Sequence, residues 1–138
     1  MPIDASHALS RMEWMRRHRP ALWEKTRWVM LPKDYCLYKL TGRVVSDPIS
    51  NVGLVDSALA PIPELLARVP GAAERLPPLS GMATIAGTLH GHSEIGTPAV
   101  AVGTMDAWDG MFGVGPLEPE SSFYLSGTSE TLGTVSDE

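Results

Sequence analysis

The chain has 138 residues, of which 43% are hydrophobic and 20% charged, proportions typical of a globular protein and not of a disordered one. Its length is sufficient for one ordinary hydrophobic core. The net charge of −5 disfavours general attraction to nucleic acid or to an anionic membrane surface.

Cysteine content and hydropathy further limit the kinds of site and the cellular location that the sequence allows. Cys36 is the only cysteine, which excludes an intrachain disulfide and a zinc site built from cysteines. The apolar periodicity around it predicts a buried structural thiol. No segment has the apolar core of a signal peptide or the length of a membrane span, so we expect a cytoplasmic protein.

The first thirty residues predict two helices. One extends from about residue 6 to Pro20, and a second begins at Pro20 and continues through Trp28 to Met30. Tryptophans at such spacing are typical of core packing. The basic cluster at 16–19 could bind an anion, but such a cluster is more typical of a solvated helix face.

A third helix is predicted to begin at Pro32 and to end at Thr41-Gly42. Asp34 falls in its first turn, where a carboxylate interacts favourably with the helix dipole. Asp47, followed by proline, predicts the N-cap of one more helix.

The middle of the chain is rich in proline. Residues 58–81 predict connecting segments with a short helix over 64–69, and residues 84–89 predict a short strand. His90 and His92 have ligand chemistry, but no carboxylate or thiol stands near them in the sequence. A metal site there is therefore disfavoured.

A strand, a turn and a helix are predicted within residues 99–115. Small apolar residues from Ala99 predict a buried strand, Gly103 breaks it, and apolar residues resume at helical spacing after Asp106. A carboxylate at a helix N-terminus beside a buried strand is a common location for chemistry in α/β proteins. Asp106 is therefore the first candidate for a catalytic group, with a simple N-cap as the alternative. Asp109 is the weaker candidate, because an acid there complements the helix dipole.

The last part of the chain predicts a connector and a hairpin. Residues 116–120 form a polar, proline-bearing connector of the kind that separates domains. Residues 122–126 and 131–135 predict two strands around the turn Gly127-Thr128-Ser129. Backbone amides and hydroxyls in such a turn suit phosphate oxygens, although these residues also occur in turns for conformational reasons. Neither a Walker motif nor a dinucleotide-binding fingerprint is present.

In this order, the elements resemble the FGGY-type carbohydrate kinases, especially the xylulokinase-like branch. The resemblance is weakest over residues 58–81. The most specific block is a helix ending in Leu-Thr-Gly that is followed shortly by an acid and a serine. The matching blocks are SRMEWM (10–15), LPKDYCLYKLTG (31–42), VSDPIS (45–50), and the turn and helix at 103–115 with SGTS (126–129) behind it.

The resemblance implies an α/β fold, an actin-like, ribonuclease-H-like ATPase domain that is incomplete in this chain. Members of the family are several times longer. Residues 1–115 would form the C-terminal part of the first, sugar-kinase domain. Residues 116–138 would form the connector and the first hairpin of the second, ATP-binding domain. The implied activity is ATP-dependent phosphorylation of a sugar or polyol hydroxyl, with a xylulose-like substrate favoured and the isolated chain expected to be inactive.

The resemblance also implies roles for individual residues. Asp106 resembles the general base of the family, which binds the sugar hydroxyl and accepts its proton as the γ-phosphoryl group arrives. Gly127, Thr128 and Ser129 resemble the second phosphate loop, which binds the phosphates of ATP. Mg²⁺ would neutralise charge on the transferred group and on the leaving diphosphate.

The sequence departs from the family pattern in three places. Glu130 adds a negative charge beside the phosphate loop, the segment after Asp56 lacks a tryptophan, and the approach to Asp106 contains fewer glycines. An alternative to the kinase is a noncatalytic remnant that associates, as a homodimer or with a partner, through sheet edges. A hydrolase that uses Asp106 with Asp109 is disfavoured, because residues three apart on one helix leave no defined gap for a substrate.

Overall fold

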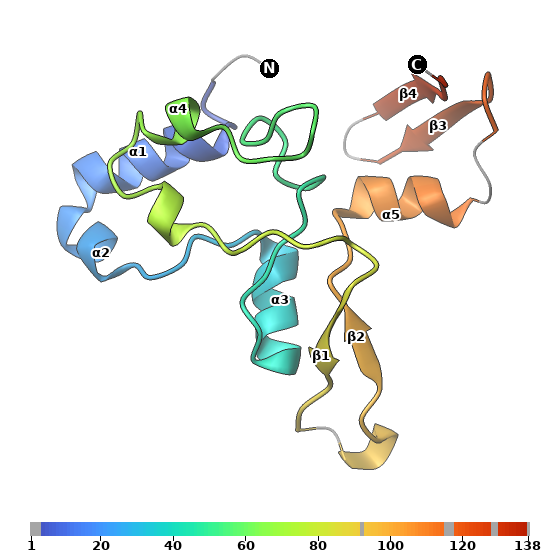
Figure 1. Ribbon diagram of the computed structural model, residues 1–138, viewed down its shortest axis with the longest axis horizontal. Helices are drawn as coiled ribbons and strands as arrows, with labels where there is room; N and C mark the ends of the chain where they lie inside the picture. Colours follow the sequence, from blue (N-terminus) through green and yellow to red (C-terminus); the bar gives the residue numbers. More distant parts are fainter. Residues whose placement is uncertain (1–3, 92, 115–117, 128–129, 138) are drawn as a thin grey trace.

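The computed structural model describes residues 4–91, 93–114, 118–127 and 130–137 (Figure 1). Within these residues, four helices precede the first strand, and a fifth helix lies between the two strand pairs. The helices are α1 (Ala8–His18), α2 (Pro20–Lys25), α3 (Pro32–Thr41), α4 (Pro63–Leu66) and α5 (Asp106–Gly113), with single 3-10 turns at Ala73–Arg75 and Ser93–Ile95. The strands are β1 (Ile85–Thr88), β2 (Ala99–Ala101), β3 (Ser122–Ser126) and β4 (Glu130–Thr134).

The described strands form two separate antiparallel pairs. β1 pairs with β2, with Thr88 opposite Ala99 and a bulge near Ile85. β3 pairs with β4 in regular register from Ser122 opposite Thr134 to Ser126 opposite Glu130. The β1–β2 hairpin projects beside α3, whereas α5 lies against the β3–β4 hairpin (Figure 1). The strands predicted at residues 84–89, 122–126 and 131–135 are thus confirmed, with small differences at their ends.

The main hydrophobic core lies under α1 and α2. α1 begins after the buried His7, whose Nδ1 accepts a hydrogen bond from the Leu9 N–H at 3.2 Å. The guanidinium of Arg75 lies 4.6 Å from the centre of the Trp23 ring. This core positions the first two helices. Its buried members are Leu9, Met12, Trp23, Leu54, Leu66, Val69 and Ala72.

The second helix is shorter than the sequence pattern predicts. It ends at Lys25, and the following segment is extended because the Val29 N–H donates to the Arg75 carbonyl at 2.7 Å. The expectation that the tryptophans pack in the core is correct for Trp23, which is 6% exposed, and wrong for Trp14, which is 51% exposed. Trp14 instead stacks on His18 within α1.

The predicted burial of Cys36 is wrong. Cys36 is exposed, because the buried residues of α3 are Asp34, Leu37 and Thr41, which follow one another at helical spacing on a different face. This free thiol therefore has no structural role in the core.

Two further expectations need correction. The Asp47 side chain accepts the Ser50 N–H at 2.8 Å, as an N-cap would, but the chain continues as a series of turns and not as a helix. In β2, Ala99 and Ala101 are exposed and only the following Val102 is buried, so the strand itself is not a buried one. No described helix is both long enough and apolar enough to cross a membrane.

Candidate active site

A cleft of about 310 Å³ separates the first turns of α5 from the β3–β4 hairpin. Gly103 turns the chain from β2 into the loop before α5 with a φ of +68°, a conformation that favours glycine. This turn brings the N-terminus of α5 to face the hairpin. The described residues that line the cleft are Asp106, Ala107, Gly110, Leu125, Ser126, Gly127 and Thr131.

Asp106 is the first residue of α5 and is exposed to this cleft. The N-cap position belongs to Met105, and no side chain caps the helix. The Asp106 Oδ1 accepts only the backbone N–H of Ala107, at 2.9 Å, among the described residues. The N-cap alternative for Asp106 is therefore wrong. Asp109 is exposed as well, but it is not among the described residues that line the cleft.

The hairpin supplies the other wall of the cleft. Gly127 lines it at the end of β3, so the structure brings Gly127 and Asp106 to one cavity. Thr128 and Ser129, the other two residues of the predicted phosphate loop, lie outside the described residues. Glu130 is exposed at the start of β4, opposite Ser126.

A buried polar cluster that the sequence did not predict adjoins the loop before α5. The Lys33 Nζ is 2.7 Å from Oδ1 of Asp34 and 2.7 Å from Oδ1 of Asp47. Asp34 and Asp47 are 1% and 0% exposed. The Asp47 Oδ2 accepts the Thr104 hydroxyl at 3.0 Å, so the cluster extends to the loop that leads into Asp106. We call Lys33, Asp34, Asp47, Ser50 and Thr104 the buried polar cluster.

Electrostatic and hydrogen-bonding partners shift the pKa values inside this cluster. Burial alone would raise the pKa of Asp47, but hydrogen bonds from Lys33, Ser50 and Thr104 outweigh it, so the pKa lies below its ordinary value. Burial would likewise lower the pKa of Lys33, but pairing with Asp34 and Asp47 raises it. Both groups are therefore ionised at neutral pH.

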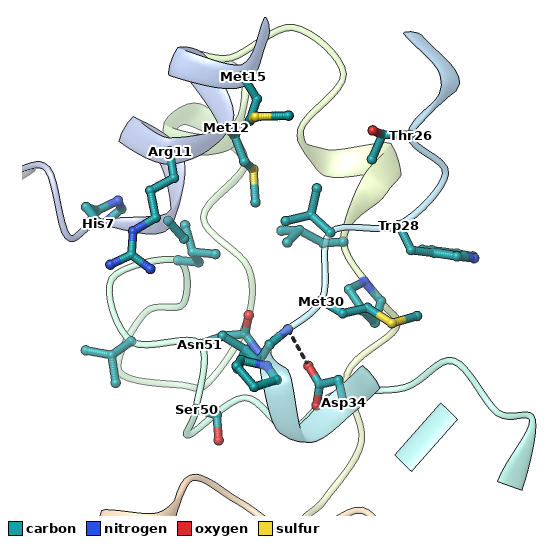
Figure 2. A pocket seen from close by; sticks show the side chains of 18 of the residues that line it. His7, Arg11, Met12, Met15, Thr26, Trp28, Met30, Asp34, Ser50 and Asn51 are labelled. Atoms are coloured by element: carbon teal, nitrogen blue, oxygen red, sulfur yellow. Dashed lines mark hydrogen bonds between the residues drawn. The ribbon is translucent and has the colours of Figure 1, made fainter. Parts of the chain in front are cut away.

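A second, largely apolar cavity of about 450 Å³ lies beneath α1. Figure 2 shows Met12, Trp28 and Met30 around it, together with polar residues that include Ser50 and Asp34. The dashed hydrogen bond there is donated by the Leu31 N–H to the Asp34 Oδ2 at 3.3 Å, which fixes the first turn of α3. Asp34 and Ser50 therefore belong both to this cavity and to the buried polar cluster.

Among the described residues, the remaining charged and metal-binding candidates do not gather into a site. Arg16 and Arg17 both pair with Glu13, which lowers the pKa of Glu13 to about 2, as expected for a solvated helix face. Within the described residues no group of three or more potential metal ligands gathers in one place. His90 is exposed, and His92 lies outside the described residues.

No family model matches the chain. The chain is 29% identical over 133 residues to the autoinducer-2 kinase of Escherichia coli strain SMS-3-5 / SECEC, an alignment that covers 90% of this chain and 25% of that protein. It is 26% identical over 133 residues to the autoinducer-2 kinase of Salmonella paratyphi B. A solved xyloylose kinase from Brucella ovis matches with a TM-score of 0.75 and 29% identity, over 88% of this chain and 27% of that one. Over about nine tenths of its length, the chain therefore resembles a segment of the FGGY-type carbohydrate kinases.

The chain also shares its fold with solved sugar kinases of lower sequence identity. The ligand-bound xylulose kinase of Lactobacillus acidophilus matches with a TM-score of 0.81 and 18% identity, over 96% of this chain and 29% of that one. The xylulose kinase of Rhodospirillum rubrum matches with a TM-score of 0.77 and 22% identity, over 94% of this chain and 28% of that one. The α/β class is thereby supported, and the chain spans about a quarter of the length of the curated relatives it matches.

Proposed function

We propose that this segment forms part of the active site of an enzyme that transfers the γ-phosphoryl group of ATP to a hydroxyl of a sugar or polyol, with Asp106 as the general base. The observation that supports the proposal most is that Asp106 and Gly127 line one cleft from opposite sides. The base and the nucleotide loop must be close together, because the hydroxyl attacks the terminal phosphate directly.

The environment of Asp106 suits the removal of a proton from an alcohol. The carboxylate is exposed, and only its Oδ1 accepts a hydrogen bond from the described residues. Oδ2 is thus available to accept a hydrogen bond from a substrate hydroxyl. That hydrogen bond would orient the alcohol and receive its proton as the bond to phosphorus forms.

The nucleotide would be held at the hairpin turn. Gly127 has no side chain to obstruct a phosphate, and we propose that Thr128 and Ser129 complete the loop with their amides and hydroxyls. When bound, Mg²⁺ neutralises phosphate charge. The cleft fits a Mg²⁺ that is held mainly by ATP, because Asp106 is the only carboxylate among the described residues that line it.

The substrate is a polyhydroxylated small molecule. The related proteins are named for autoinducer-2, xylulose and gluconate, so their names agree on a kinase and differ on the acceptor. We propose a xylulose-like acceptor and a cytoplasmic location. We also propose that residues 1–115 and 116–138 belong to successive domains. The isolated chain would then be inactive for want of the remaining sugar and adenine contacts.

The test compares Asp106→Asn with Asp109→Asn. Asparagine keeps the acceptor for the Ala107 amide but cannot take a proton. In a protein of family length that carries this segment, Asp106→Asn should lower kcat for sugar-dependent ADP release by about 10²- to 10⁴-fold. Asp109→Asn should leave it near wild type. Wild-type turnover in Asp106→Asn would remove Asp106 from the mechanism.

A binding measurement tests the nucleotide half of the proposal on the 138-residue chain. Titration of the ¹⁵N-labelled chain with Mg·ATP should shift the amides of Gly127 and of the first turn of α5. The amides of α1 should stay unchanged. Shifts confined to α1, or none at millimolar nucleotide, would contradict the assignment of the hairpin turn.

A second candidate function is a noncatalytic module that associates through its sheet edges. It is favoured by the β3–β4 pair, which has only two strands among the described residues and exposes Tyr124 and Leu132, at 57% and 78%. A concentration-dependent dimer in sedimentation equilibrium, together with no response to Mg·ATP, would support this candidate over the kinase.

A further inference from the structure

We propose that Thr104 and Asp47 are positioning residues for Asp106, which they act on through the short loop between β2 and α5. This inference rests on the proposed function of Asp106 as the base. It assigns a role to the buried polar cluster, whose members are not among the described residues that line the cleft. The buried hydroxyl of Thr104, two residues before Asp106, would then determine the position of the Asp106 carboxylate.

The contacts of Thr104 fix its side chain from two sides. Its hydroxyl donates to the Asp47 Oδ2 at 3.0 Å and lies 3.1 Å from the Ser50 hydroxyl. Because the single hydroxyl hydrogen of Thr104 goes to the carboxylate, Ser50 is the donor to Thr104. The Ser50 N–H also donates to the Asp47 Oδ2, at 2.8 Å. Thr104 is 4% exposed, so water does not compete for these bonds.

The Asp47 carboxylate is itself immobilised. Its Oδ1 is paired with the Lys33 ammonium, which also pairs with Asp34 in the first turn of α3. Its backbone carbonyl accepts the Asn51 side-chain amide at 2.7 Å. The partner of Thr104 is therefore held by a helix and by a turn, and it provides a fixed reference point for the loop.

Backbone bonds hold the preceding residues of the same loop. The Val102 N–H donates to the Thr84 carbonyl at 2.9 Å, and the Gly103 N–H donates to the Met82 carbonyl at 2.9 Å. Thr104 is the next residue and is held by its side chain. The loop is thus attached at three consecutive residues.

Asp106 has no comparable attachment of its own. Among the described residues its side chain accepts a hydrogen bond only from the next amide of its own helix, and it is exposed. Its location relative to the hairpin is therefore set by its backbone, which the loop before it and the helix α5 after it hold. Of the residues in that loop, Thr104 is the one whose side chain reaches the buried polar cluster.

The test removes the Thr104 hydroxyl while keeping its shape. Thr104→Val loses the hydrogen bonds, Thr104→Ser retains them, and Thr41→Val removes an equally buried hydroxyl, 4% exposed, that bonds the Leu37 carbonyl inside α3. In the 138-residue chain, ¹⁵N order parameters at 105–107 should fall from about 0.85 to below about 0.6 in Thr104→Val. They should stay high in Thr104→Ser and in Thr41→Val.

Unchanged order parameters in a folded Thr104→Val would overturn the proposal. A fall of the same size in Thr41→Val would overturn it too, since the effect would then reflect general loss of stability. If Thr104→Val does not fold, Ser50→Ala takes its place. It removes one of the two partners of Thr104, and it should lower the order parameters at 105–107 partway.

Kinetics distinguish positioning from a purely structural role. In a protein of family length, Thr104→Val should lower kcat by about 10-fold or more with little change in KM for ATP, because a small misplacement of a reacting group is costly. On the Asp106→Asn background it should have no further effect. Equal losses on both backgrounds would refute positioning. Wild-type turnover in Asp106→Asn would instead refute the proposed function, and the order parameters would still decide the positioning.

Discussion

Lys33→Met is the substitution that tests the buried polar cluster most directly. Lys33 is the shared cation of Asp34 and Asp47, at 2.7 Å from each, and these carboxylates are 1% and 0% exposed. Methionine keeps much of the aliphatic stem but removes the ammonium, so two buried carboxylates lose their shared counter-ion. Breaking a buried ion pair from one side costs about 3–5 kcal/mol.

That cost is a large share of the total stability, since folded domains are stable by only about 5–15 kcal/mol. Urea unfolding followed by circular dichroism should give an unchanged m-value and a midpoint that is lower by the corresponding amount. The matched control is Lys39→Met, an exposed lysine of the same helix with no ion pair among the described residues. It should change the free energy of unfolding by no more than about 0.5 kcal/mol.

If Lys33→Met lowered the free energy of unfolding by less than about 1 kcal/mol, the reasoning would be refuted. An exposed salt bridge contributes a stability of that order. Such a small loss would mean that water reaches Asp34 and Asp47 and replaces the lysine. The buried polar cluster would then be too loose to serve as a reference for Thr104.

Two more predictions follow from the same region. Although burial opposes both shifts, hydrogen bonds and pairing lower the pKa of Asp47 and raise that of Lys33. Their stabilisation should therefore be complete between about pH 4 and pH 10, fall as the pH drops through the folded pKa of Asp47, and fall again as it rises through that of Lys33. Urea unfolding across this pH range measures the effect. If the free energy of unfolding fell as much at acid pH in Asp47→Asn as in the wild type, the prediction would be contradicted. Gly103→Ala should cost about 1–2 kcal/mol through its positive φ alone, since a Cβ there meets nothing within 4 Å. Gly110→Ala, equally open but helical, should stabilise by up to about 1 kcal/mol, and thermal unfolding that ranks the two the other way would contradict this account.

Local sequence patterns were sufficient to locate α3 and the β3–β4 hairpin. Pro32 and Gly42 mark the ends of α3, and the strands are separated by a glycine turn, so each element carries its own boundary signals. The prediction failed at residues 26–30. The apolar spacing there is compatible with a helix, but the Val29 amide bonds to Arg75, a partner that lies far along the chain.

The buried polar cluster was missed for the same reason. Asp34 and Asp47 each have a sufficient local interpretation, as a first-turn acid and as a cap, and each does accept a nearby backbone N–H. Their shared lysine and the link from Asp47 to Thr104, across 57 residues, exist only in the folded chain. The one signal available was a Lys-Asp pair at the start of a helix.

In this site the proposed base Asp106 is exposed, whereas Thr104, two residues before it, is buried and holds the loop. A proposed base must be open to its substrate, because burying its carboxylate would shut out the alcohol. Asp106 is accordingly exposed, which leaves its side chain without packing to fix it. Thr104 is buried instead, so the loop can be held rigidly while the acid stays accessible. Asp109 shares the exposure of Asp106 but stands a helical turn farther from that anchor and outside the described lining of the cleft, which favours Asp106 as the reacting carboxylate.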